Sequence, residues 1–256
     1  MNVLALIPCR MASSRFPNKP LVKIQGKAMI EHIYIRALLS KRIDEVFIAT
    51  CDQEIIDFCK SLNLNVVLTK NSHERATERC AEALIEIEKI RNKKFDVIVM
   101  IQGDEPLIHP QMLDSLVNPF LNDNNLQVCN LINEIQKKSE IENRNVVKTI
   151  MDVDSNAIYF SREPIPSKLM YKKMIIYYKQ LGLISFSRKS ILNFIKLDPT
   201  NLEIIESVDM NRLIENNIKI KLVQTTHESK GVDTYEDFLE VDSLMKDDEL
   251  FISYNV

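Results

Sequence analysis

The chain has 256 residues, of which 45% are hydrophobic, and its formal net charge is −3 at pH 7. This length and composition allow a globular α/β protein with a sizeable core. Basic and acidic residues are mixed throughout, which excludes the positive field of a nucleic-acid binder, and apolar runs such as LALI and VIVMI are far shorter than the ~20 residues of a membrane span.

The first half of the chain alternates apolar runs with amphipathic segments. The apolar runs predict buried strands at 3–8, 46–50, 65–68 and 96–101. Apolar residues at three- and four-residue spacing predict helices at 29–39, 53–62, 77–90 and 110–121. This alternation favours an α/β fold in which helices cover both faces of a mostly parallel sheet.

The second half, after residue 122, has a less regular pattern. We expect strands at 127–132, 146–151, 157–160, 176–186 and 218–224. Helices are predicted near 206–216 and from about 234. Because no Pro/Gly/Ser-rich linker divides the halves, we expect a single domain over residues 1–256 with an elaborated second half.

The cysteines and histidines restrict the compartment and the metal chemistry. The five cysteines lack a Cys-x-x-Cys pair and have apolar neighbours, which is typical of reduced thiols in a cytoplasmic protein. The amino terminus shows no secretory-signal pattern. None of the four histidines forms a zinc-type spacing with a cysteine, so we expect no transition-metal site.

A positively charged loop follows the first predicted strand. Arg10, Arg15 and Lys19 lie in it with almost no acidic residue nearby. The loop has no glycine, so it cannot form a Walker-type backbone cradle, and its side chains would have to bind phosphate directly. We interpret the three cations as a polyphosphate site; a solvated basic loop is the alternative.

Three further strings carry candidate functional groups. Strand 96–101 runs into QGDEP, which places the Asp104 carboxylate at the carboxyl end of a strand, where Mg²⁺ bound to a nucleotide would find an oxygen ligand. Asp233, in GVDT, is a second candidate ligand, although Asp233 or Thr234 also suits a helix cap. The string HERATERCAE contains the start of a helix at Thr77, for which capping alone is the simpler interpretation.

Several of these strings occur in an order that resembles one known family. PCR at 8–10, SSR at 13–15, KPL at 19–21, QGDEP at 102–106, YFSR at 159–162 and GVDT at 231–234 together resemble the 3-deoxy-manno-octulosonate (Kdo) cytidylyltransferases, or CMP-Kdo synthetases. The resemblance extends from residue 3 to about 241. It implies a three-layer, Rossmann-like fold of the nucleotide-diphospho-sugar transferase type, with a mixed sheet.

The resemblance also implies an activity and a set of site residues. The anomeric hydroxyl of an acidic 2-keto sugar would attack the α-phosphate of CTP, with Arg10, Arg15 and Lys19 as catalytic and triphosphate-binding residues and with Asp104 and Asp233 as ligands of Mg²⁺. The implied nucleotide-binding set adds Thr77, Arg79, Gln102 and Asp104. The implied sugar-binding set is Arg162, Gln180, Glu206 and Asp209.

The same resemblance assigns roles to the two halves. Residues 1–122 would mainly bind the nucleotide, and residues 123–256 would mainly bind the sugar and form a homodimer through the region 146–186. The activated sugar would serve lipopolysaccharide or capsule synthesis.

The chain departs from the family at positions that bear on the substrate. It has Arg75 and Ala76 where the family commonly has Ser-Gly, Gln180 where it has His, and Asp209 where it has Glu. Kdo and a related 2-keto sugar acid therefore both stay open as acceptors. Two other functions are alternatives: a sugar-1-phosphate nucleotidylyltransferase, disfavoured by the glycine-free loop, and a non-catalytic nucleotide-binding protein of the same fold.

Overall fold

The structure is a computed structural model that describes residues 1–12, 16–170 and 173–255. Within these residues the main sheet has nine strands. They are β1 (Val3–Pro8), β4 (Glu45–Thr50), β5 (Val66–Leu68), β6 (Val97–Ile101), β7 (Val128–Glu134), β8 (Lys148–Met151), β9 (Ala157–Ser161), β10 (Tyr178–Ser187) and β11 (Ile220–Gln224). A small separate hairpin consists of β2 (Lys23–Ile24) and β3 (Lys27–Ala28).

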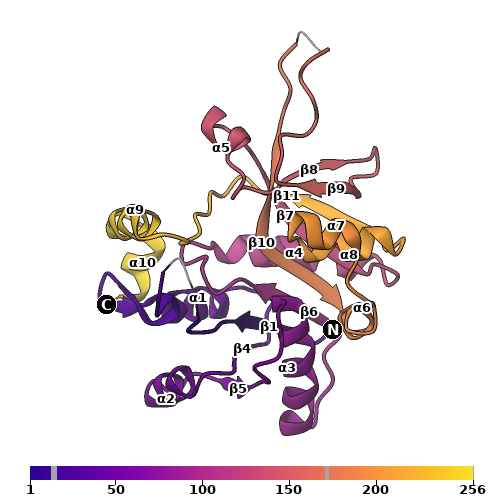
Figure 1. Cartoon of the computed structure of the whole chain (residues 1–256). Coiled ribbons are helices and arrows are strands. Elements are labelled where there is room, and N and C mark those ends of the chain that lie inside the picture. The colour runs from indigo at the N-terminus through magenta and orange to yellow at the C-terminus, as the bar shows by residue number, and fades with distance from the viewer. Residues whose placement is uncertain (13–15, 171–172, 256) are drawn as a thin grey trace.

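The sheet is mixed and joins both halves of the chain. Its order is β11-β7-β10-β6-β1-β4-β5, and β8 and β9 extend it beside β10. Strands β6, β1, β4 and β5 are parallel, whereas β10 runs antiparallel between β6 and β7. Strand β10 thus connects the regular first half with the strands of the second half (Figure 1).

Helices cover both faces of this sheet, as the sequence predicts (Figure 1). The helices are η1 (Lys19–Leu21, a 3₁₀ turn), α1 (Met29–Leu38), α2 (Gln53–Ser61), α3 (Ala76–Arg91), α4 (Pro110–Asn122), α5 (Lys138–Glu142), α6 (Arg188–Phe194), α7 (Asn201–Glu206), α8 (Asp209–Glu215), α9 (Tyr235–Lys246) and α10 (Glu249–Tyr254). Alternate residues of β1 point to opposite faces: Ile7 belongs to a core that includes residues of α1, α2, α4 and α9, and Leu6 belongs to a core that includes residues of α3, α6 and α8. Two hydrophobic cores therefore enclose the sheet.

The predicted strands and helices of both halves are confirmed to within a few residues. The helix predicted near 206–216 is confirmed as α8, Asp209–Glu215; a separate helix, α7, was not predicted and ends at Ser207, whose positive φ of 52° interrupts the helical path. The hairpin β2–β3, α5, α6 and α10 were not predicted, because each is too short to show a clear hydrophobic period.

An extended arm leaves the sheet between β9 and β10. Residues 162–170 and 173–177 project away from the body of the molecule (Figure 1). Leu169, Met170 and Met174 on this arm are 86%, 92% and 92% exposed.

Among the residues that the structure describes, no helix is both long enough and apolar enough to cross a membrane.

Candidate active site

The candidate site lies where β1 and β6 end. The two strands are parallel neighbours with Leu6 opposite Met100, so the loops that follow them begin side by side. A Cβ atom at Gly103 would lie 2.9 Å from the carbonyl oxygen of Pro8, a distance that no side chain tolerates. Glycine at this position therefore lets the turn after β6 pack directly against the start of the positively charged loop.

A lysine joins two carboxylates that are distant in sequence. The Lys19 Nζ atom donates to Asp104 Oδ2 at 2.9 Å and to Asp233 Oδ1 at 3.4 Å. Lys19 begins η1, Asp104 follows β6, and Asp233 precedes Thr234, which caps α9 by accepting the N–H of Asp237. The capping role considered for Thr234 is confirmed, and the adjacent Asp233 faces the turn after β6.

Two contacts hold the segment before α9 against that turn. The Val232 N–H donates to the Asp104 carbonyl oxygen at 2.8 Å, and the Ser229 hydroxyl donates to the carboxylate of Glu105. Burial, followed by the nearby Asp104 charge, raises the pKa of Glu105 to about 7. Asp104 and Glu105, adjacent in sequence, therefore have different roles: one faces Lys19 and the other anchors the segment that carries Asp233.

A cavity of about 740 Å³ opens beside these groups. Its lining residues are Pro8, Cys9, Arg10, Ala12, Lys19, Pro20, His73, Glu74, Arg75, Ala76, Arg79, Gly103, Asp104 and Asp233. The structure thus brings together Arg10, Lys19, Arg79 and both predicted metal ligands. Arg15 lies outside the described residues.

Two predicted nucleotide-binding residues are not part of this lining. Thr77 is fully buried, and its hydroxyl donates to Asp209 Oδ2 at 2.9 Å. The Gln102 side chain packs against β10, where a Cβ atom at Gly182 would lie 2.6 Å from Gln102 Cδ. A direct contact of Thr77 or Gln102 with a nucleotide stays a prediction.

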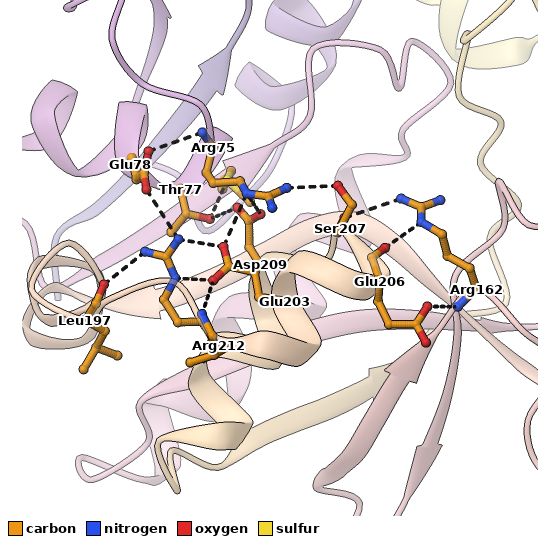
Figure 2. Close-up of polar contacts among 12 residues, drawn as sticks. Arg75, Thr77, Glu78, Arg162, Leu197, Glu203, Glu206, Ser207, Asp209 and Arg212 are labelled. Carbon is orange, nitrogen blue, oxygen red and sulfur yellow. Dashed lines mark hydrogen bonds and ion pairs between the residues drawn. The ribbon is translucent and has the colours of Figure 1, made fainter.

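The predicted sugar-binding residues fall into three places. Arg162 and Glu206 form two hydrogen bonds (Figure 2). The backbone N–H of Arg162 donates to Glu206 Oε2 at 2.7 Å, and the side-chain Nε of Arg162 donates to the Glu206 carbonyl oxygen at 2.6 Å. Asp209 lies near the start of α3, beside Thr77. Gln180 lies on β10 and donates to Asn130 Oδ1 at 2.6 Å. Their contact with a sugar stays a prediction.

Two cavity residues were not among the predicted site residues. His73 and Arg75 both line the cavity, and both belong to the string HERATERCAE. His73 pairs with Glu82, whereas Arg75 extends toward α7 and α8 (Figure 2). In the sequence, Arg75 stood out only as a departure from the family pattern, and that departure does not indicate which residues it contacts.

The donor set fits a magnesium ion. Asp104 and Asp233 already converge on one cation, the Lys19 ammonium group. Nowhere in the described part of the chain do three or more His, Cys, Asp or Glu side chains form a metal-binding group. Two carboxylates are what Mg²⁺ takes from a protein when substrate phosphates and water supply the other ligands.

Sheet, cavity and charges together are those of a nucleotide-binding transferase, and the comparison with protein families defines the class. The model of the family described as cytidylyltransferase matches residues 4–220 of the 256-residue chain. The protein is therefore a nucleotidyltransferase of the cytidylyltransferase class.

Curated relatives narrow this class. The chain is 36% identical to the 3-deoxy-manno-octulosonate cytidylyltransferase of Geotalea daltonii, over 96% of this chain and 99% of the relative. It is 37% identical to the mitochondrial 3-deoxy-manno-octulosonate cytidylyltransferase of Arabidopsis thaliana, over 96% of this chain and 84% of the relative. The chain belongs to the 3-deoxy-manno-octulosonate cytidylyltransferase family.

Solved structures agree with this assignment. A structure of CMP:2-keto-3-deoxy-manno-octonic acid synthetase complexed with CTP matches with a TM-score of 0.87 and 32% identity, over 96% of this chain and 99% of that one. The predicted nucleotide-diphospho-sugar transferase fold is thereby confirmed. A putative glucose-1-phosphate thymidylyltransferase from Bacillus anthracis, at 16% identity and a TM-score of 0.69, shares the fold alone.

Proposed function

We propose that this protein transfers CMP from CTP to the anomeric hydroxyl of Kdo or a closely related 2-keto sugar acid and releases pyrophosphate. One observation carries the proposal: Lys19 lies between Asp104 and Asp233 in a cavity that Arg10 also lines. This arrangement offers both cations for a triphosphate and carboxylates for its metal ion. The family to which the chain belongs supports the choice of CTP and Kdo.

The chemistry requires neutralisation of charge more than a covalent nucleophile. The anomeric hydroxyl oxygen forms a bond to the α-phosphorus and releases its proton to solvent, while the bond from that phosphorus to the bridging oxygen breaks and the electron pair leaves with pyrophosphate. Both reactants are anions, so repulsion opposes their approach. Arg10 and Lys19 offset the phosphate charge and stabilise the charge that develops in the transition state. Arg15, from the same loop, is predicted to add a third cation.

Asp104 and Asp233 would hold Mg²⁺ in this enzyme. The ion would supply further neutralisation of the phosphate oxygens. The protein's own contribution is to keep the two carboxylates on one side of the cavity, through the Val232 and Ser229 contacts. We propose that Thr77, Arg79 and Gln102 contribute to the cytidine side of the site.

We place the acceptor near Arg162 and Glu206, with Gln180 and Asp209 adjusting its selection. The Glu206 carboxylate accepts hydrogen bonds from the Tyr159 and Ser161 hydroxyl groups, at 2.7 and 3.0 Å. The Arg162 guanidinium group, which main-chain carbonyl oxygens hold in place, suits the carboxylate of the acceptor, and the Glu206 carboxylate suits its hydroxyl groups. Residues 1–122 would thus mainly bind the nucleotide, and residues 123–256 would mainly bind the sugar.

We also propose that the protein is a cytoplasmic homodimer. The exposed apolar side chains of the arm, Leu169, Met170 and Met174, are suited to pairing with a second copy. All five cysteines are free thiols, as in a reducing compartment. Light scattering after size-exclusion chromatography tests the dimer: Leu169→Ser combined with Met174→Ser should shift the mass toward the monomer, and an unchanged dimer would exclude the arm as the interface.

The first test of the activity is pyrophosphate release with CTP and Mg²⁺. The acceptors are Kdo, its 8-amino analogue, other 2-keto sugar acids and a panel of sugar 1-phosphates. Turnover with Kdo supports the proposal. Turnover with another acid would indicate that Gln180 and Asp209 determine which acceptor the enzyme selects. Turnover only with a sugar 1-phosphate, or CTP binding without turnover, would overturn it in favour of one of the two alternatives.

A further inference from the structure

Strand β10 contains a bulge where it pairs with β7. Gln180 lies opposite Ile132 and Ile184 lies opposite Asn130, so β10 advances by four residues while β7 advances by two. Such a bulge leaves main-chain groups without their usual partners in the sheet. The Asn130 side chain, which is 0% exposed, lies at this place and supplies a partner to main-chain groups of the bulge.

Asn130 forms hydrogen bonds through both ends of its side-chain amide. Its Nδ2 atom donates to the carbonyl oxygens of Leu181 and Leu183 in the bulge, at 3.0 and 3.2 Å, and to that of Leu131 at 3.0 Å. Its Oδ1 atom accepts a hydrogen bond from Gln180 Nε2 at 2.6 Å. One buried amide thus connects the main chain of the bulge with the side chain of Gln180.

These hydrogen bonds determine which way the Gln180 amide faces. Carbonyl oxygens only accept, so the Asn130 atom beside Leu181 and Leu183 must be the amide nitrogen, and its other atom must be the oxygen. The Gln180 atom beside that oxygen must then be the donor, Nε2. Gln180 Oε1 accepts no hydrogen bond from the described residues. Solvent reaches this atom, because the only buried side-chain N or O atom without a partner among those residues is Thr200 Oγ1.

The Gln180 amide lies on the same face of the sheet as Thr77 and Asp209. Both neighbours of Asn130 in β7 belong to the core that includes residues of α1 and α4, so the Asn130 side chain points to the opposite face. Met100 of β6 belongs to the core on that face. The Thr77 hydroxyl lies 3.8 Å from Met100 Sδ and donates to Asp209 Oδ2. Gln180 therefore meets Asn130 on the face where Asp209, a predicted sugar-binding residue, also lies.

The bulge is also joined to the turn that carries Asp104. The Gln102 N–H donates to the Gly182 carbonyl oxygen at 3.0 Å. The Gln102 side chain lies so close to Gly182 that a Cβ atom there would be 2.6 Å from Gln102 Cδ. The turn after β6 and the Asn130 side chain therefore hold the bulge from two neighbouring strands, and Gln180, at the start of the bulge, has a fixed place relative to the proposed metal ligand.

We propose that Asn130 is a positioning residue that turns the Gln180 amide so that Oε1 accepts a hydrogen bond from one hydroxyl group of the acid sugar. This inference rests on the proposed function, because it concerns the acid sugar of that reaction. An oxygen that only accepts is satisfied by a group that donates and gains nothing from a group that only accepts. The site should therefore distinguish a hydroxyl group from fluorine at one position of the sugar.

Substrate analogues test the direction of this hydrogen bond in the full-length wild-type protein. They carry hydrogen or fluorine in place of one hydroxyl group of Kdo at a time, the anomeric hydroxyl excepted. The kcat/KM for each is measured by pyrophosphate release at saturating CTP and Mg²⁺. At one position we expect both replacements to lower kcat/KM about tenfold, which corresponds to the loss of one hydrogen bond. Fluorine should fail there as hydrogen does, because it cannot donate.

Variants assign the hydrogen bond to Gln180 and its direction to Asn130. Gln180→Met keeps the length of the side chain without its polar atoms, so kcat/KM for Kdo should fall about tenfold, and the two analogues should react within about twofold of Kdo. Asn130→Leu removes the group that orients the Gln180 amide, so the preference for hydroxyl over fluorine should fall to about threefold or less. Adding Asn130→Leu to Gln180→Met should not change the preference further, because Asn130 acts through Gln180.

Controls separate this positioning role from a general loss of structure. Asn65→Leu removes another side-chain amide that donates to a main-chain carbonyl oxygen, that of Val46 at 3.2 Å, and should leave the preference for hydroxyl unchanged. The KM for CTP should stay within about twofold of the wild type in every variant. Thermal unfolding shows which variants are folded. If Asn130→Leu does not fold, Asn130→Ser replaces it with the same expected loss of preference, and the wild-type analogue series tests the amide direction without any variant.

Three results would overturn the inference. These are a fluoro analogue that reacts like Kdo where the deoxy analogue fails, a preference for hydroxyl that is absent from the wild type or that Gln180→Met leaves intact at every position, and a wild-type preference in a folded Asn130 variant. Each refutes the inference alone when the wild type turns over Kdo. If the wild type uses another acid sugar, analogues of that sugar take the place of those of Kdo. A wild-type protein that binds CTP but turns over no acid sugar refutes the proposed function, and the inference with it.

Discussion

An ion cluster lies at each end of β6, and the two clusters have opposite arrangements of charge. At the carboxyl end, one cation, Lys19, lies between Asp104 and Asp233. At the amino end, one carboxylate, Glu88 of α3, lies between two cations: Arg188 binds both of its oxygens, at 2.7 and 2.9 Å, and Lys94 binds at 2.6 Å. The backbone N–H of Phe95, just before β6, donates to the same carboxylate at 3.2 Å.

The two clusters differ in their exposure and in the partners of their carboxylates. The Glu88 side chain is 2% exposed, and its oxygens are occupied by protein donors. The Asp104 and Asp233 side chains are 27% and 38% exposed and line the cavity. The Glu88 carboxylate therefore has a structural role, whereas the partly exposed carboxylates of Asp104 and Asp233 can be reached by a ligand in the cavity.

The largest expected effect is the loss of Asp104. Asp104→Ala removes the carboxylate that we propose as a ligand of Mg²⁺, so turnover should fall by about 1,000-fold or more, because a group that stabilises the transition state is lost. The protein should remain folded, since Lys19 can then pair with Asp233 alone. Pyrophosphate release measures the turnover, and thermal unfolding shows whether the variant is folded. Asp96→Ala, at the other end of the same strand, is the matched control, and near-normal turnover in folded Asp104→Ala would exclude the metal assignment.

A smaller effect is expected for Lys19. Lys19→Ala removes one cation but leaves both carboxylates for Mg²⁺, so the turnover should fall by about 100-fold, the range found when one charge-stabilising donor is lost. Higher Mg²⁺ should recover part of this loss, because the carboxylates no longer bind an internal cation. Kinetics at several Mg²⁺ concentrations test this point. If the variant matches the wild type at every CTP concentration, Lys19 is not part of the site.

The sequence predicts the ion cluster at the carboxyl end of β6 but not the cluster at its amino end. The residues after the strand were predictable, because polar side chains at the carboxyl end of a buried strand form a recognisable pattern, and Lys19, Asp104 and Asp233 do meet there. The contact of Arg188 with Glu88 was not, since the two residues are 100 positions apart and neither string carries a motif. The end of α7 at Ser207 was not predicted for a different reason: glycine or asparagine usually takes the left-handed position that ends a helix, and here a serine takes it.

Substitution of Glu88 should affect stability and not chemistry. Glu88→Gln keeps the shape but removes the charge that binds Arg188 and Lys94, so the free energy of unfolding should fall by about 2–3 kcal/mol. Turnover of the folded protein should be unchanged, because this cluster lies at the opposite end of β6 from the cavity. Urea unfolding followed by circular dichroism measures the loss. Glu86→Gln, on the exposed surface of the same helix, should change the free energy of unfolding by less than about 0.5 kcal/mol.

The pH dependence of stability gives the finest test of the Glu88 cluster. Burial alone would raise the pKa of Glu88, but hydrogen bonds from Arg188, Lys94 and the Phe95 N–H lower it to about 2. In the unfolded chain the same carboxylate takes up its proton near its ordinary value of 4.5. As the pH falls from 4.5 toward 2, the unfolded state binds this proton and the folded state does not, so the contribution of Glu88 to stability is complete above this window and is lost within it. Urea unfolding between pH 3 and pH 6 should therefore show a steeper decline for the wild type than for Glu88→Gln, and the two curves should converge toward low pH. Parallel curves would mean that Glu88 titrates alike in both states, and the arginine and lysine contacts would then not hold its charge in solution.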